Sequence, residues 1–218
     1  MERLLCLAIG YVCGLLQTSY IYGRMHGIDI RNYGSGNAGT TNALRTLGKK
    51  AGLITLLGDA LKCIVAVVIA WLIFRESHPE MVKLLELYAS AGTILGHNFP
   101  FYLKFRGGKG IAATAGLLAS VDIRIGVVAL IVFIIVFLTT HYVSLGSIMV
   151  YVTFVAGLVV LGENQGYSMD MRYVREMYII AAALAVMAIY KHRANIQRLL
   201  SGTENKTYLS SKKKAGQR

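Results

Sequence analysis

Two polar, glycine-rich segments carry residue types that bind anions, although each lies between strongly apolar stretches of the chain. The first is Ser35–Arg45, and the second is Gly96–Gly110, which ends in three glycines around Lys109. Glycine lets backbone N–H groups approach a phosphate closely, and a helix that starts after the glycines directs its unpaired N–H groups at the charge. Residues 111–119 are expected to form such a helix. The sequence therefore predicts chemistry on a phosphate at a membrane face.

The first segment holds more hydroxyl and amide side chains than one helix start can use. Each Ser, Asn or Thr alone would be explained as an N-cap. Because they cannot all cap one helix, we interpret the segment as a ligand-binding loop. Arg45 lies one turn past Thr41 and can present its planar guanidinium group to a phosphate. The candidate binding residues of this segment are Ser35, Asn37, Thr41, Asn42 and Arg45.

In the second segment, glycines surround Lys109 in the manner of a phosphate nest, in which backbone N–H groups face an anion and the lysine supplies a point charge. The glycines concerned are Gly107, Gly108 and Gly110. Their spacing differs from that of the nucleotide-binding P-loop, so they do not indicate a nucleoside triphosphate. His97, at the start of the segment, is either a buried histidine bonded to backbone or a ligand-binding residue.

Polar side chains also follow later apolar stretches. His192 and Asn195 are three residues apart, so they share one face of a helix and can point into the same pocket. A turn near residue 142 adds hydroxyl groups on the same side of the membrane, including that of Ser144. The alternative for the basic residues near His192 is a simple anchor at the end of a membrane helix.

Asp59 and Lys62 lie within an apolar stretch, again three residues apart. Charged residues inside a membrane normally pair with one another or serve a functional site. We interpret them as a structural ion pair that supports the loop at 35–45, and a direct part in the site is the alternative.

The composition is that of an integral membrane protein. The chain has 218 residues, of which 55% are hydrophobic and 16% charged, with a mean hydropathy of +0.53, whereas a soluble domain has about 25% charged residues. We predict one all-α domain over residues 1–201, with about seven transmembrane helices. The expected spans are 4–22, 52–74, 82–99, 110–121, 124–140, 145–161 and 175–191. The first is too long for the apolar part of a signal peptide, and the fourth reaches only roughly 18 Å of a ~30 Å core.

The orientation follows from the basic residues. Most of the 23 Lys and Arg residues lie in the loops that carry the glycine-rich segments and in the C-terminal region. The positive-inside rule therefore places these segments and the C-terminus in the cytoplasm, and the N-terminus outside. Residues 202–218 are expected to be a disordered basic tail that touches anionic lipid.

Several familiar catalytic devices are missing from the sequence. There is no H-x-x-x-x-D motif, no G-x-S-x-G motif and no acidic cluster that could hold Mg²⁺. The three cysteines have no metal-ligand spacing. We therefore expect neither metal nor cofactor, and a site made of cations and hydrogen-bond donors that binds two anions at once.

Three motifs together resemble those of the bacterial acyl-phosphate:glycerol-3-phosphate acyltransferases, the PlsY family. They are Ser35–Asn42, Gly96–Gly110 and His192–Glu204, and the resemblance extends over nearly the whole chain. The second motif, GHxFPxxxxFxGGKG, is long and specific. Thr40 and Gly146 are mild departures, since a small residue and a serine are usual at these positions.

The resemblance implies a reaction, its substrates and its site. An acyl group would pass from acyl phosphate to the 1-hydroxyl of glycerol 3-phosphate, giving lysophosphatidic acid and phosphate in the first step of phospholipid synthesis. The acceptor's own phosphate would help to deprotonate the hydroxyl. Ser35, Lys109 and His192 are expected to be catalytic, and the remaining candidates to bind substrate: Asn37, Thr41, Asn42, Arg45, His97, Gly107, Gly108, Gly110, Ser144 and Asn195.

The expected location is the bacterial plasma membrane, with the active site on its cytoplasmic face. The partners would be acyl phosphate, glycerol 3-phosphate and membrane lipid, together with functional coupling to the enzyme that makes acyl phosphate, and no nucleic acid. The alternative is a transporter for a phosphorylated metabolite, since broken helices with N-termini aimed at anions also occur there. A transporter would hold its polar motifs near the midplane, whereas these cluster at one face.

Overall fold

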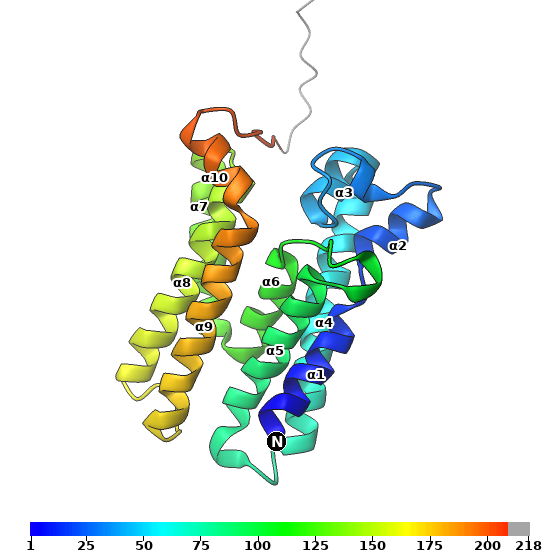
Figure 1. Cartoon of the computed structure of the whole chain (residues 1–218). Coiled ribbons are helices and arrows are strands. Elements are labelled where there is room, and N and C mark those ends of the chain that lie inside the picture. Colours follow the sequence, from blue (N-terminus) through cyan, green and yellow to red (C-terminus); the bar gives the residue numbers. More distant parts are fainter. Residues whose placement is uncertain (209–218) are drawn as a thin grey trace, which may run out of the picture.

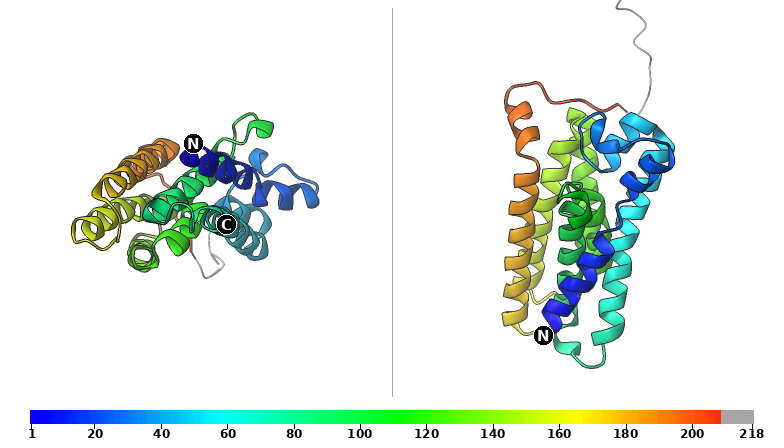
Figure 2. Two further views of the ribbon diagram at one scale, coloured as in Figure 1. Left: turned by 90° about the horizontal axis from the view of Figure 1, so that it is seen from below. Right: turned by 45° about the vertical axis from the view of Figure 1, so that its right-hand side comes forward.

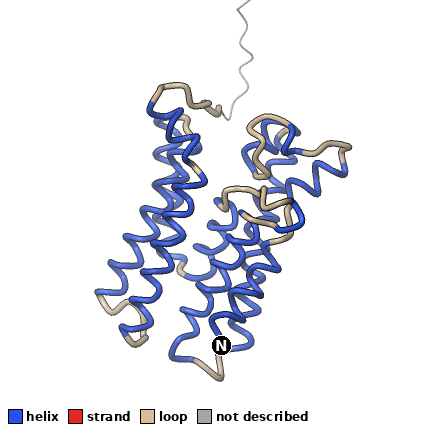
Figure 3. Tube along the Cα trace, viewed as in Figure 1, coloured by secondary structure: helices blue, strands red, loops and turns tan. Residues whose placement is uncertain are grey.

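The computed structural model describes residues 1–208, and all regular structure in this part of the chain is helical (Figure 1, Figure 3). The expected all-α membrane architecture is confirmed. The α-helices are α1 (Glu2–Gly14), α2 (Thr18–Met25), α3 (Thr40–Leu47), α4 (Lys49–Phe74), α5 (Val82–Asn98), α6 (Ile111–Val121), α7 (Ile123–Thr140), α8 (Val143–Glu163), α9 (Met171–Lys191) and α10 (Arg193–Leu200). Short 3₁₀ helices are η1 (Ile30–Asn32), η2 (Pro79–Met81) and η3 (Phe101–Leu103).

Within residues 1–208, five helical segments are long and apolar enough to cross a membrane. They are Glu2–Met25, which includes α1 and α2, and the helices α4, α7, α8 and α9. The two other expected spans are shorter, since α5 has 17 residues and α6 has 11. The shorter of the two, α6, is nevertheless apolar, and both helices lie among the longer ones (Figure 1). The count of seven membrane crossings stays a prediction.

Helices α1 and α5 touch backbone to backbone because each has glycines four residues apart. These are Gly10 and Gly14 in α1, and Gly92 and Gly96 in α5. A methyl group at any of the four would collide with main-chain atoms of the facing helix. Small residues at this spacing let membrane helices approach closely enough for strong van der Waals contact. The end of α1 is thereby held against the end of α5, where the glycine-rich loop begins.

The first expected span, 4–22, is not continuous. Residues between Gly14 and Thr18 leave the helix, and α2 continues in a different direction (Figure 1). The Gln17 side chain is fully buried at this break and donates from Nε2 to the carbonyl oxygens of Gly14, Gly96 and His97. Non-helical backbone is tolerated at membrane depth only where protein satisfies its polar groups, and Gln17 does so here.

The helices form two groups that lie side by side, α1 with α4, α5 and α6, and α7 with α8 and α9 (Figure 2). The first helix of the second group, α7, is largely exposed and apolar, with Ile131, Ile135 and Leu138 pointing outward. Such a surface suits contact with lipid. Helices α3 and α10 lie at one end of the bundle, opposite the N-terminus, and the loop before α6 lies toward the same end but deeper in the bundle (Figure 1).

Helix α6 is short because the loop before it is recessed into the bundle. Its far end reaches the opposite loops, where Asp122 accepts a hydrogen bond from Tyr167 at 2.8 Å. Eleven residues span only about 17 Å, so the glycine-rich loop starts well inside the protein. Lys62 lies about 20 Å from the start of α4, and it contacts His97 beside this loop. The segment 110–121 therefore falls short on the side of the motifs.

Residues 203–208 form a strap without regular structure at the motif end. The N–H group of Thr207 donates to the carbonyl oxygen of His141 at 2.9 Å, and the Tyr208 ring lies 4.7 Å from the His141 ring, centroid to centroid. This part of the expected tail therefore packs against the turn between α7 and α8. The rest of the expected tail, 209–218, lies outside the described residues.

Candidate active site

A chain of polar contacts joins the second motif to the third. Lys109, in the loop before α6, donates from Nζ to Oδ1 of Asn195 in α10. Asn195 in turn donates from Nδ2 to Oε1 of Glu204 at 2.7 Å. Two segments far apart in the sequence thus meet at one place.

Glu204 is the centre of this cluster, and sequence reasoning gave it no role. Besides Asn195, its carboxylate accepts hydrogen bonds from Ser144 Oγ at 2.9 Å and from Arg198 Nε at 2.7 Å. Burial alone would raise the pKa of Glu204, but these three hydrogen bonds outweigh burial and keep the pKa below its usual value. The carboxylate stays charged and balances the surrounding cations.

The pKa of Lys109 is lower than that of an ordinary lysine. Burial, with the neighbouring cations Arg198, Lys191 and Arg45, lowers its pKa to about 8, although the charge of Glu204 opposes the change. The first motif also packs against this loop, since a methyl group at Gly108 would lie 2.7 Å from the carbonyl oxygen of Ala38. An anionic ligand stabilises a partly buried cation of this kind, because contact with the ligand compensates for the hydration that the cation lost on burial.

Arg45 reaches across from α3 to the strap. Its Nη2 donates to Thr207 Oγ1 at 2.8 Å, and burial lowers its pKa from the usual value. No side chain caps the start of α3, so the N–H groups around Thr40 and Thr41 remain available to a ligand. None of the polar side chains of 35–45 caps this helix, and their expected role in ligand binding stays a prediction.

The amide of Asn42 holds the first motif together. Its Oδ1 accepts from the N–H group of Ser35 at 2.9 Å, and its Nδ2 donates to the carbonyl oxygens of Ile30 and Tyr33. All its polar atoms are thus engaged in the loop, and the side chain is buried. Ser35 itself is exposed, and no hydrogen bond within residues 1–208 ties its side chain, or that of Asn37, to the Lys109 cluster.

The glycine loop has no room for side chains. The N–H groups of Gly107 and Gly108 donate to the carbonyl oxygens of Asn98 and His97. A methyl group at Gly108 would overlap Nε2 of His97 and would lie 2.7 Å from the carbonyl oxygen of Ala38. Gly110 has φ of +82° and precedes α6, whose start no side chain caps. The loop therefore packs against the first motif and leaves the N-terminus of α6 open to an anion.

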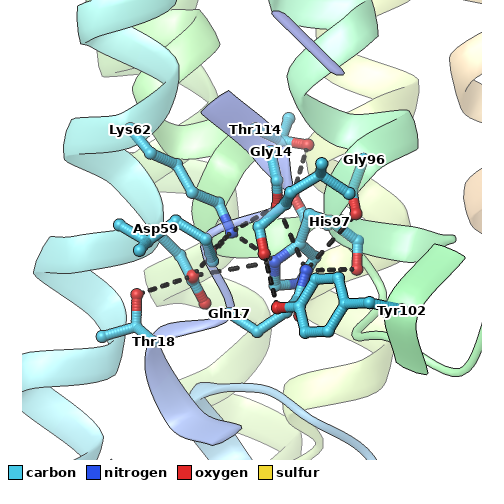
Figure 4. A network of polar contacts seen from close by, with 12 residues as sticks. Gly14, Gln17, Thr18, Asp59, Lys62, Gly96, His97, Tyr102 and Thr114 are labelled. Carbon is cyan, nitrogen blue, oxygen red and sulfur yellow. Dashed lines mark hydrogen bonds and ion pairs between the residues drawn. The ribbon is translucent and has the colours of Figure 1, made fainter. Parts of the chain in front are cut away.

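Asp59 and Lys62 do form the expected ion pair, with 2.9 Å between Nζ and Oδ1. The expectation that this pair supports the loop at 35–45 is wrong. Lys62 instead contacts the carbonyl oxygens of Gly14 and Leu16, at the break after α1, and the His97 ring (Figure 4). Asp59 accepts a hydrogen bond from Thr18. Sequence spacing predicted the pair but could not show which segment packs against it.

His192, at the end of α9, is buried and neutral. Its Nδ1 lies 2.8 Å from the carbonyl oxygen of Ala188, so this nitrogen carries the ring proton and Nε2 keeps a lone pair. Burial, followed by the charge of Lys109, lowers its pKa to about 4. His192 can therefore accept a hydrogen bond through Nε2 at neutral pH.

Lys191 also belongs to the supporting structure, although its position suggested only a membrane anchor. Its Nζ donates to the carbonyl oxygen of Asn98 at 3.2 Å and lies 4.8 Å from the centre of the Phe99 ring. It thus ties the end of α9 to the start of the glycine-rich segment. A basic residue at a helix end is too common for sequence alone to reveal this role.

Comparisons with known proteins agree with this arrangement. Residues 4–202 match the family model described as glycerol-3-phosphate acyltransferase. The chain belongs to this family. A glycerol-3-phosphate acyltransferase from Thermoanaerobacter sp. (strain X514) is 40% identical over 94% of this chain and 96% of its own. One from Clostridioides difficile (strain 630) is 42% identical over 91% of this chain and 92% of its own.

Solved structures of the glycerol-3-phosphate acyltransferase family share the fold. The crystal structure of PlsY, an integral membrane glycerol 3-phosphate acyltransferase in its glycerol 3-phosphate form, matches with a TM-score of 0.82 and 30% identity. The match covers 95% of this chain and 96% of that one. A second form of PlsY, with lysophosphatidic acid, matches with a TM-score of 0.79. The family resemblance inferred from the three motifs is confirmed, and the chain is a membrane acyltransferase.

Proposed function

We propose that the protein transfers a fatty acyl group from acyl phosphate to the 1-hydroxyl of glycerol 3-phosphate. The hydroxyl oxygen forms a bond to the acyl carbon, the bond from that carbon to the phosphate oxygen breaks, and inorganic phosphate leaves. The other product is lysophosphatidic acid. Both substrates carry a phosphate group, so the site must bind two anions side by side.

The convergence of separate anion-binding elements on Lys109 carries this proposal. On one side lies the glycine loop with the open N-terminus of α6. On the other side lie Arg45 and the uncapped start of α3, with Arg198 and Asn195 from the third motif. Acyl phosphate is already an activated anhydride. Positioning and stabilisation of developing negative charge are therefore the main demands on the protein.

The proton of the attacking hydroxyl is best taken by a substrate phosphate. A phosphate monoester has its second pKa at about 6, whereas the pKa of His192 is about 4. The phosphate is thus the stronger base by about two pKa units. His192 Nε2 accepts a hydrogen bond from the acceptor and orients it, and Glu204 is occupied by its three hydrogen bonds.

We place this site on the cytoplasmic face of the bacterial plasma membrane. The loops at the motif end of the bundle, together with the C-terminal region, carry most of the basic residues of the chain, and basic loops face the cytoplasm. Acyl phosphate and glycerol 3-phosphate would reach the site from that side, and the enzyme that makes acyl phosphate would act as its functional neighbour.

Purified protein supplied with palmitoyl phosphate and glycerol 3-phosphate is expected to release phosphate and form lysophosphatidic acid in the presence of EDTA. No group of three or more His, Cys, Asp or Glu side chains within residues 1–208 could hold a metal ion, and the proposed mechanism uses none. Palmitoyl coenzyme A as the donor is the control and should give no product. Activity that disappears in EDTA and returns with Mg²⁺ would show the mechanism to be wrong.

The pH dependence of kcat/KM should follow the charge of Lys109. This lysine is charged below pH about 8 and neutral above it, so kcat/KM should fall as the pH rises through about 8. Lys109→Arg keeps its charge to higher pH and should move this decline upward. His192, with its pKa of about 4, stays neutral from pH 5 to 9. A decline near pH 6 that His192→Gln abolishes would contradict this assignment.

A further inference from the structure

A charged cluster lies buried in the middle of the bundle (Figure 4). It touches the glycine loop through His97. Its members Asp59, Lys62 and His97 are each at most 5% exposed. Lys62 Nζ lies within hydrogen-bond distance of four atoms: Leu16 O at 2.6 Å, His97 Nδ1 at 2.8 Å, Asp59 Oδ1 at 2.9 Å and Gly14 O at 3.3 Å. A lysine ammonium group has three hydrogens, which match the three short contacts.

The contact between Lys62 and His97 decides where the imidazole carries its proton. An ammonium group only donates hydrogen bonds, so His97 Nδ1 must accept and must be unprotonated. A neutral imidazole then has its proton on Nε2. Asp59 Oδ1 is 3.6 Å from His97 Nδ1, too far for the carboxylate to take a proton from that nitrogen in competition with Lys62.

The other ring nitrogen faces the glycine loop. A methyl group at Gly108 would overlap His97 Nε2, so this nitrogen lies directly against the Gly108 backbone. Within residues 1–208, the only side-chain hydrogen bond of the His97 ring is the one through Nδ1. The same histidine binds the loop through its main chain, because its carbonyl oxygen accepts from the N–H group of Gly108 at 3.1 Å.

We propose that Lys62 is a positioning residue, which places the imidazole proton of His97 on Nε2 and thereby adds a fixed N–H donor to the phosphate-binding glycine loop. Without that contact the two tautomers of a neutral imidazole compete, and the tautomer with its proton on Nδ1 turns a lone pair toward the loop. A lone pair repels an anion that an N–H group attracts. Lys62 never touches the substrate and acts entirely through His97.

Asp59 and the broken first helix keep Lys62 in place. Asp59 Oδ1 accepts from both Lys62 and Thr18. The carbonyl oxygens of Gly14 and Leu16, freed where α1 ends, take two further contacts from Nζ. The break after α1 therefore has a use, since a continuous helix would engage these oxygens in its own hydrogen bonds. Partners of this kind, which orient a site residue from behind, are each worth about 10- to 100-fold in activity.

The tautomer can be measured on the unaltered protein. Full-length protein with ¹⁵N-labelled histidine, in lipid bilayers, should show a His97 signal with an unprotonated Nδ1 and a protonated Nε2. The signal is assigned by replacing each of the other four histidines with Gln. A His97 proton on Nδ1 in the unaltered protein would overturn the proposal, and this result needs no variant of the cluster.

A double variant, Asp59→Leu with Lys62→Met, tests the consequence for the reaction, and this arm rests on the proposed function. Replacing a buried ion pair by apolar residues of similar size often leaves stability unchanged, so no unpaired charge confuses the result. We expect kcat/KM to fall by about 10- to 100-fold and the Nδ1–H tautomer of His97 to become populated. The matched control is Lys83→Met with Glu86→Leu, which removes another pair with i,i+3 spacing and should change neither quantity.

Each outcome has one meaning. A folded double variant that keeps more than half of the wild-type kcat/KM would overturn the positioning role. If the double variant does not fold, the spectrum of the unaltered protein still decides the tautomer. If the unaltered protein shows the Nε2–H tautomer but no acyl transfer from palmitoyl phosphate, the proposed function fails and the assignment of His97 stands.

Discussion

Lys109→Ala is expected to lower kcat/KM by about 30- to 1,000-fold, which corresponds to roughly 2–4 kcal/mol of lost transition-state stabilisation. Lys109 is the point at which the glycine loop, Asn195 and the charge of Arg45 meet. Its ammonium group is partly buried, so water cannot replace it as a partner for a phosphate. Steady-state kinetics with each substrate varied in turn measures the loss.

Arg106→Ala is the matched control for Lys109→Ala. Arg106 is an exposed cation in the same loop, and its removal should leave kcat/KM within about twofold of wild type, since exposed charges interact weakly. If Lys109→Ala keeps more than half of the wild-type kcat/KM, Lys109 does not bind substrate. The grouping of the glycine loop, Asn195 and Arg45 around it would then serve another purpose.

Gly108→Ala should be nearly as damaging, by about 100-fold in kcat, although it removes no functional group. The added methyl group would overlap His97 Nε2 and lie 2.7 Å from the carbonyl oxygen of Ala38. The ring is held by Lys62 and the carbonyl oxygen belongs to the main chain, so neither can simply rotate away and the loop must move. A displacement of about 1 Å at a reacting centre costs about 100-fold in rate.

Gly23→Ala provides the comparison for Gly108→Ala. Gly23 lies in α2, where a methyl group would come no closer than 3.3 Å to any neighbour, and its activity should stay near wild type. Thermal unfolding of both variants separates a shifted loop from a misfolded protein. Wild-type kcat for a folded Gly108→Ala variant would show that the contact between the loop and His97 is not needed.

Much of this architecture could be predicted from the sequence. Apolar runs of about 20 residues predict membrane helices because the bilayer sets the length, and α4, α8 and α9 each contain the expected spans. The glycines around Lys109 indicated a close backbone contact, and Gly107 and Gly108 do pack tightly against their neighbours, while the expected anion-binding role of the loop stays a prediction. The three-residue spacing of Asp59 and Lys62 predicted their ion pair.

Features that depend on tertiary packing could not be predicted. The break between α1 and α2 lies within an apolar run, and only the buried Gln17 hints at it. Glu204 was visible only as one acid in a basic segment, because its three donors come from α8 and α10. Asn42 resembled a ligand-binding residue, and the hydrogen bonds that engage it inside the loop depend on a backbone path that sequence patterns do not describe.

The charged pair in α4 also bears on how the chain enters the membrane. A lone Lys or Asp at the centre of an inserting helix costs about 2.5–3.5 kcal/mol. Asp59 and Lys62 lie on one face of the same helix, so they can neutralise each other before any other helix is present. Gly14 and Leu16 are synthesised before α4, so their carbonyl oxygens gain their contacts with Lys62 only when α4 enters the membrane. We therefore expect the bundle to assemble in order: α1 inserts first, and the carbonyl oxygens at its end gain their hydrogen bonds only after α4 has inserted.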